Sequence, residues 1–129
     1  MPPTAYPADW PTIAQQVKDA AQWHCIRCGH AHSRDGWRVL TVHHLDGDKA
    51  NCAWWNLVAL CQRCHLHIQA KVVMARVWMW DHSPWFVPYV AGYYAAQHGL
   101  PTERAWVEQH ADQLIALGQG RIAALPQES

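Results

Sequence analysis

The spacing of apolar residues in the first half of the chain predicts a helix followed by a two-stranded hairpin. Apolar positions recur at helical intervals over residues 9–23, with Asp9 as the N-cap and Pro11 in the first turn, where proline is tolerated. Residues 37–42 (WRVLTV) and 56–61 (NLVALC) have the β-branched, aromatic and apolar composition of strands. Because turn-forming residues fill the segment between them, we expect an antiparallel hairpin with a long loop.

The pattern after the second strand is helical again. From Gln62 to about Trp78, Cys64 and Ile68 belong to an apolar seam, and His65 lies on an adjoining stripe. The order strand, loop, strand, helix predicts an α+β core.

Two further helices are predicted in the C-terminal part of the chain. Ser83 and Pro84 open one that ends at Gly99, and Thr102 caps another that ends near Gly118. The aromatic side chains of this region could form a base-stacking platform, but core filling is favoured because helices normally bury their aromatics. The aromatic residues concerned are Trp78, Trp80, Trp85, Phe86, Tyr89, Tyr93 and Tyr94.

These elements predict a single domain over residues 1–129, with an N-terminal helix at 9–23, a core at 24–78 and a C-terminal helical extension at 79–129. A chain of 129 residues is long enough for one modest hydrophobic core. The first residues lack the basic and apolar regions of a secretory signal, and charges and prolines interrupt the most apolar stretch. We therefore expect a cytoplasmic protein with no membrane partner.

Charge is distributed unevenly along the chain. The formal net charge is +0, which counts against a nucleic-acid partner. However, the stretch from Arg27 to Arg76 contains seven Lys or Arg against three Asp, a net charge of +4. This basic stretch coincides with the predicted core, so composition leaves both a nucleic-acid surface and ordinary surface charge open.

The cysteines favour metal binding over disulfides, because no sequence feature indicates export. Four of the five form two Cys-x-x-Cys pairs, Cys25 with Cys28 and Cys61 with Cys64. Zn²⁺ prefers four soft ligands in a tetrahedron, and two such turns supply them. A redox dithiol is the alternative, which two pairs in one small chain disfavour. We expect a structural zinc ion, with Cys52 as a free thiol.

A pair of histidines closes the first predicted strand. His43 and His44 are adjacent, so their side chains should point to opposite sides of a strand. One imidazole can then bind a metal ion while the other faces a water molecule, and phosphodiester hydrolysis needs both roles. Two loop histidines without function are the alternative. His65, which follows the second cysteine pair, favours the catalytic interpretation.

The sequence resembles the HNH endonuclease family in its zinc-stapled form. The resemblance covers about residues 25–72 and depends on a His-His pair, an Asn-Leu pair, a Cys-x-x-Cys-His motif and the preceding Cys-x-x-Cys. It implies the ββα-metal fold and hydrolysis of DNA to a 5′-phosphate and a 3′-hydroxyl.

The same resemblance implies a role for each polar residue of the motif. His43 and His65 would be ligands of a catalytic divalent ion, and His44 would be the general base, with its other ring nitrogen held by a backbone carbonyl. Asn56 would brace the long loop and so hold His44 in place.

One position departs from the family's pattern. Many members have a further histidine four residues after the helical ligand, where this chain has Gln69, and His67 would point away from His65. The catalytic ion would then have two protein ligands, with water and substrate oxygens completing its shell. Such a site suits Mg²⁺ or Mn²⁺, and imidazole ligands also admit Ni²⁺ or Zn²⁺. Asp46 and Asp48 are predicted as turn formers.

Three basic residues are candidates for contacts with DNA phosphates: Arg63, Lys71 and Arg76, of which Arg76 lies nearest the stripe of His65. We therefore expect a metal-dependent DNA endonuclease, and the sequence leaves open whether it nicks one strand or cuts both. The alternative is a catalytically silent, zinc-stabilised module that binds DNA or protein, which Gln69 and the zero net charge favour. Small stand-alone proteins of this type are often phage-encoded, so a phage packaging protein is a further candidate partner.

Overall fold

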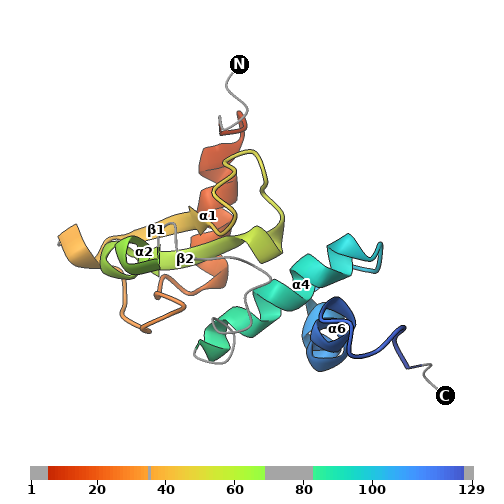
Figure 1. Ribbon diagram of the computed structural model, residues 1–129. Coiled ribbons are helices and arrows are strands. Elements are labelled where there is room, and N and C mark those ends of the chain that lie inside the picture. The colour runs from red at the N-terminus through yellow and green to blue at the C-terminus, as the bar shows by residue number, and fades with distance from the viewer. Residues whose placement is uncertain (1–5, 35, 69–82, 127–129) are drawn as a thin grey trace. The chain divides into compact units, whose positions relative to one another are not determined.

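A computed structural model describes residues 6–34, 36–68 and 83–126, and it is α+β (Figure 1). The chain divides into two compact units, Met1–Met74 and Ala75–Ser129. Among the described residues, the first unit contains two α-helices and a two-stranded sheet, and the second contains three α-helices. The expectation of a single domain stays a prediction.

The first unit is built on the predicted hairpin. β1 (Leu40–His44) pairs antiparallel with β2 (Leu57–Cys61), and the register places Leu40 opposite Cys61. All five residues of β2 are buried, because α1 and α2 both contact it. Its side chains are apolar on both faces for the same reason.

The first strand is displaced from the predicted residues 37–42. Gly36–Arg38 forms a 3₁₀ turn (η1), and the strand begins at Leu40 and includes both histidines. The cause lies in the partner strand. Since the chain turns into a helix directly after Cys61, no strand is left to pair with residues 37–39, and strand propensity alone cannot hold them extended.

The N-terminal helix α1 (Trp10–Ala20) is shorter than the predicted 9–23. Asp9 occupies the N-cap position but makes no side-chain capping bond. After the helix, Gln22 and Trp23 both adopt left-handed backbone conformations, with φ of 53° and 57°. Two such residues in succession reverse the chain toward the first cysteine turn.

The helix α2 (Gln62–Ile68) follows β2 without a loop. Cys61 therefore ends the strand and Cys64 lies in the first helical turn, as predicted. Cys64 and Ile68 are buried, which confirms the expected apolar seam over this part of the helix. The rest of the predicted helix, to Trp78, lies outside the described residues.

In the second unit, a 3₁₀ turn (η3, Pro84–Phe86) leads into α4 (Val87–Gln97), which packs against α5 (Arg104–Gln109) and α6 (Ala111–Gly118). Core filling is confirmed for three of the aromatic residues. Phe86, Tyr89 and Tyr94 are at most 6% exposed. Trp78 and Trp80 lie outside the described residues.

The prediction of one helix from Thr102 to Gly118 is wrong. The helix begins at Arg104 and is interrupted at His110, whose φ and ψ are −110° and 18°. The ring of His110 stacks on Trp106, and its Nδ1 lies 2.8 Å from the Trp106 carbonyl oxygen. Since a carbonyl only accepts, Nδ1 donates to it. The His110 amide donates to the same carbonyl at 3.1 Å, so the break keeps the helical backbone bond.

Gly118 is required where α6 meets α4. A Cβ atom at this position would overlap the ring of Tyr94, which is buried. We expect Gly118→Ala to lower the free energy of unfolding of the second unit by about 1–3 kcal/mol, the usual cost of overpacking. Urea unfolding would measure it, with Gly36→Ala as the control because a Cβ there meets nothing within 4 Å. Equal stability of Gly118→Ala and the wild type would contradict this packing.

No helix in the described part of the chain is both long enough and apolar enough to span a bilayer.

Candidate functional site

The four predicted cysteines converge in the first unit. Cys25 and Cys28 come from the loop after α1, Cys61 ends β2 and Cys64 lies in the first turn of α2. Their sulfur atoms all lie within 4.8 Å of one another, and Cys28 Sγ and Cys61 Sγ are 3.8 Å apart. One loop and a strand–helix junction therefore meet at one point.

The first cysteine turn is closed by backbone hydrogen bonds. The Gly29 amide donates to the Cys25 carbonyl at 2.8 Å, and the Cys28 amide lies 3.5 Å from Cys25 Sγ. Gly29 has a φ of 77°, which residues with a Cβ rarely adopt. The Ile26 amide donates to the Ala59 carbonyl at 2.9 Å and so fixes the turn to β2.

The cluster has the dimensions of a tetrahedral metal site. With metal–sulfur bonds of about 2.3 Å, tetrahedral geometry separates the sulfurs by about 3.8 Å, and Cys28 and Cys61 have this spacing. Burial raises the pKa of Cys25 and raises that of Cys64 to about 12. Burial also opposes ionisation of Cys61, but hydrogen bonds from Cys64 and the other thiols outweigh it and lower its pKa to about 7. A cation would favour the thiolate form of all four, so they form a site for a metal ion.

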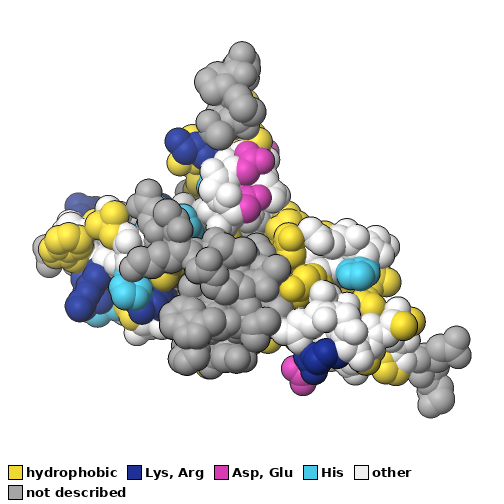
Figure 2. Space-filling model, viewed as in Figure 1, with side chains coloured by type: hydrophobic (Ala, Val, Ile, Leu, Met, Phe, Trp, Pro, Cys, Tyr) yellow, Lys and Arg dark blue, Asp and Glu magenta, His cyan; other side chains and the backbone are white. Residues whose placement is uncertain are grey.

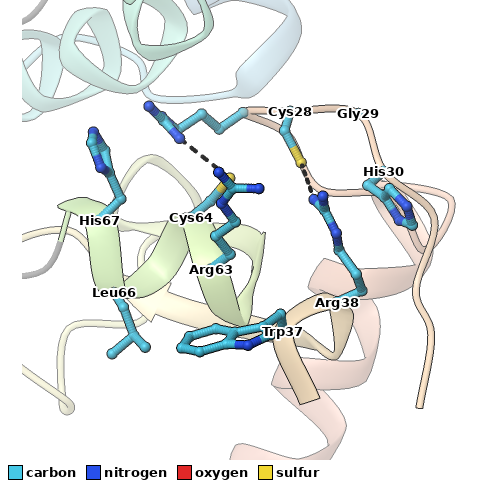
Figure 3. A pocket seen from close by; sticks show the side chains of 10 residues that line it. Cys28, Gly29, His30, Trp37, Arg38, Arg63, Cys64, Leu66 and His67 are labelled. Carbon is cyan, nitrogen blue, oxygen red and sulfur yellow. Dashed lines mark hydrogen bonds between the residues drawn. The ribbon is translucent and has the colours of Figure 1, made fainter. Parts of the chain in front are cut away.

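Two arginines contact the sulfurs from outside (Figure 3). Arg27 Nη1 donates to Cys64 Sγ at 3.4 Å, and Arg38 Nη1 donates to Cys28 Sγ at 3.8 Å. A divalent ion with four thiolates carries a net charge of about −2. Two guanidinium groups match that charge, so both arginines complement the metal site electrostatically.

The predicted pair of metal-binding histidines also meets. His43 Nδ1, from β1, lies 2.9 Å from His65 Nε2, from α2. Two nitrogens bound at right angles to one ion, with bonds of about 2.1 Å, would be about 3.0 Å apart. Burial, together with the nearby His65 and His44, lowers the pKa of His43 to about 4, and burial lowers that of His65. Both imidazoles are therefore neutral at pH 7, which is the form that binds metal ions.

Thr41 determines which nitrogen of His65 carries the proton. Its hydroxyl donates to the Leu60 carbonyl at 2.7 Å and lies 3.0 Å from His65 Nδ1. A hydroxyl has one proton, so the second contact must be a bond from His65 Nδ1–H to the hydroxyl oxygen. The Nε2 atom then has no proton, and its lone pair accepts the hydrogen bond from His43 Nδ1–H at 2.9 Å.

The pair has no third ligand in the part of the chain that the structure describes. Among residues 6–34, 36–68 and 83–126, the cysteine cluster is the one group of three or more His, Cys, Asp or Glu able to share an ion. Gln69 lies outside these residues.

His44 points to the other face of the hairpin, as expected for a neighbour of His43. Its ring packs against Trp10 of α1, with centroids 4.8 Å apart, and against Tyr6 at 5.7 Å. It is 5% exposed, and burial lowers its pKa. The predicted general base thus lies under an aromatic cover that the sequence did not predict.

The ring partner of His44 differs from the expected carbonyl. His44 Nε2 lies 4.0 Å from Cys52 Sγ, whose thiol donates to the Lys49 carbonyl at 3.8 Å. Among the described residues this contact is the one hydrogen-bond partner of the ring, so the expected backbone carbonyl stays a prediction. Cys52 is a free thiol with a contact of its own.

Asn56 links the two ends of the long loop. Its Oδ1 accepts from the Asp46 amide at 3.0 Å, and its Nδ2 donates to Asp46 Oδ1 and to the Asn51 carbonyl, both at 2.9 Å. The carboxylates of Asp46 and Asp48 accept from amides two residues further along, at 2.8 and 2.9 Å, which is the geometry of turn formers. Since Asn56 is completely buried, these bonds are shielded from water.

The predicted phosphate-binding residues are only partly described. Arg63 is exposed on α2, whereas Lys71 and Arg76 lie outside the described residues.

The sequence interpretation missed Thr41 and the aromatic cover. A signal for Thr41 was present, because residues two apart on a strand share a face and Thr41 therefore lies beside His43. No comparable signal linked Trp10 and Tyr6 to His44, since that contact depends on how α1 packs on the sheet.

Comparison of the chain with protein-family models, with curated proteins and with solved structures gives no match.

Proposed function

We propose that this protein is a metal-dependent DNA endonuclease of the HNH type, held together by a structural zinc ion. The observation that carries the proposal is the distance of 2.9 Å between His43 Nδ1 and His65 Nε2. Both nitrogens belong to neutral imidazoles, so a divalent ion could replace the proton of the hydrogen bond that joins them. Such a pair beside a hairpin and a helix fits the ββα-metal arrangement.

Zinc is the ion best suited to the cysteine cluster. Four thiolates at tetrahedral spacing are the usual ligands of structural Zn²⁺ in small intracellular domains. The ion would join the loop after α1 to the junction of β2 and α2, and so fix α2 against the hairpin. His65 lies one residue after Cys64, so the structural site would also position the proposed catalytic ligand.

The second ion would lie between His43 and His65. It would supply positive charge at the scissile phosphate and at the departing 3′ oxygen. His44 would accept a proton from the attacking water at one of its ring nitrogens. Asn56 would keep the loop after His44 in shape through its bonds to Asp46 and Asn51.

Cleavage of supercoiled plasmid DNA tests the proposal. The zinc-loaded protein should nick or linearise the plasmid when Mg²⁺, Mn²⁺, Ni²⁺ or added Zn²⁺ is present, and should leave it intact without an added ion. The products should carry 5′-phosphates. Absence of cleavage with every ion would contradict the proposal.

A second candidate function is a zinc-stabilised nucleic-acid-binding module without catalysis. The burial of His44 favours it, since a base that is 5% exposed under Trp10 and Tyr6 has little access to water. Binding of DNA without cleavage would support this candidate.

If His44 is the base, Trp10→Ala should uncover its ring and preserve or raise the rate of nicking.

Thr41 provides a separate test of the histidine pair. Thr41→Val should weaken binding of Mn²⁺ by about 10- to 100-fold, because loss of a hydrogen bond that orients a ligand has this effect. Thr41→Ser keeps the hydroxyl and should bind nearly as well as the wild type. Isothermal titration of the zinc-loaded protein with Mn²⁺ would measure both variants. Equal affinities for Thr41→Val and the wild type would show that the hydroxyl does not orient a ligand.

A further inference from the structure

The first unit has a hollow beside the cysteine cluster, on α2 and η1 (Figure 3). Its volume is about 950 Å³, and its lining includes Trp37, Leu66, Arg27, Arg38 and Arg63. None of the described residues that line it is acidic. A smaller hollow of about 490 Å³ also borders Trp37, Arg38 and Arg63.

The apolar lining of this hollow is unusually exposed. Trp37 is 64% and Leu66 47% exposed, and they are two of the four exposed large hydrophobic side chains among the described residues. Figure 2 shows Lys and Arg side chains gathered close to exposed apolar side chains and histidines at this end of the first unit. A flat indole beside guanidinium groups suits a ligand that combines a ring with an anion.

The three arginines differ in the charge that they can offer. Arg27 and Arg38 each donate one N–H to a cysteine sulfur, and together they balance the charge of the metal cluster. Arg63 is exposed and has no hydrogen-bond or ion-pair partner within the described ranges. The hollow therefore contributes about one net positive charge, from Arg63, and several further N–H donors from the other two.

We propose that this hollow binds a single-stranded segment of DNA, with a base stacked on Trp37 and a phosphate paired with Arg63. Paired bases are stacked inside a duplex and cannot reach the indole, whereas an unpaired base can. A peptide made of acidic residues could pair with Arg63 but has no flat ring for Trp37. The proposal rests on the proposed function for its choice of DNA. It places the contact away from the histidine pair, because Arg63 and His65 lie on different sides of α2.

Fluorescence anisotropy with a labelled 12-nucleotide thymidine strand tests the site, using the zinc-loaded protein without added divalent ion. Trp37→Ala should weaken binding roughly 5- to 150-fold, the loss typical of base–aromatic stacking, and leave the salt dependence unchanged. Trp37→Phe should recover most of the affinity. Arg63→Ala should reduce the slope of log K against log salt concentration by about 0.7, the value for one phosphate of a single strand.

Two matched variants serve as controls. Trp23→Ala removes another exposed tryptophan of the first unit, and Arg121→Ala removes another exposed arginine. Both should bind like the wild type. Failure of the wild type to bind, wild-type affinity in Trp37→Ala, an unchanged slope in Arg63→Ala, or stronger binding of an oligoglutamate peptide than of the strand would overturn the proposal.

Cleavage assays separate this inference from the proposed function. If binding depends on Trp37 and the plasmid stays intact with every ion, DNA binding in the hollow is supported and the nuclease function is rejected. If the protein cleaves DNA with a metal ion but Trp37→Ala binds the strand with wild-type affinity, only the proposed binding site in the hollow is rejected.

Discussion

Cys61→Ala will release the structural metal ion and unfold the first unit. Cys61 is buried at the point where β2 becomes α2, so its loss removes one ligand and separates the helix from the hairpin. Structural zinc contributes about 10–16 kcal/mol of apparent binding free energy in small zinc domains. The whole stability of a domain is about 5–15 kcal/mol. A unit of this size with a two-stranded sheet should therefore not fold without its ion.

Mass spectrometry would measure the loss of the bound metal ion, and far-ultraviolet circular dichroism would measure the unfolding. The wild type should hold one zinc ion per chain, and Cys61→Ala should hold none and lose helical and strand signal. Cys52→Ala is the matched control, because Cys52 is a free thiol outside the cluster. It should keep both the ion and the fold.

A folded, metal-free Cys61→Ala protein would show that the cluster is not needed to hold the hairpin and helix together. Zinc loss from Cys52→Ala would show that the ligands are assigned wrongly.

His65→Ala and His44→Ala should each abolish plasmid nicking. His65→Ala removes one of two protein ligands of the proposed catalytic ion, and His44→Ala removes the proposed base. Loss of general-base catalysis alone lowers rates by about 10²–10⁴-fold, and loss of the ion should do at least as much. Both variants should keep the structural zinc, because neither histidine belongs to the cysteine cluster.

Single-turnover nicking rates at saturating Mn²⁺ would measure these losses. His98→Ala is the control, because His98 is an exposed residue that follows α4 in the second unit. It should nick at the wild-type rate. Undiminished nicking in His44→Ala would show that another group activates the water, in keeping with the burial of His44.

The elements of the first unit could be predicted because their signals are local. Two Cys-x-x-Cys turns, a run of apolar residues and a helical seam each depend on residues a few positions apart. The start of β1 could not be predicted in this way. It depends on where the partner strand ends, at Cys61, and composition around Trp37 says nothing about that position.

In the candidate site, too, some features follow from local sequence signals and others depend on distant elements. The meeting of His43 with His65 follows from the order strand, loop, strand, helix, which brings the end of β1 beside α2. The burial of His44 depends on α1, which packs across the hairpin and places Trp10 over the ring. No spacing in the sequence encodes that contact. The break at His110 is similar, because it consists of the backbone angles of one residue, and the apolar pattern continues through it.

Anomalous diffraction from crystals of the zinc-loaded protein grown with Mn²⁺ is the most direct measurement of the proposed catalytic centre. We expect a manganese peak within about 2.2 Å of both His43 Nδ1 and His65 Nε2, distinct from the zinc peak among the four sulfurs. Absence of manganese between the two imidazoles, with the zinc site filled, would contradict the proposed catalytic metal site.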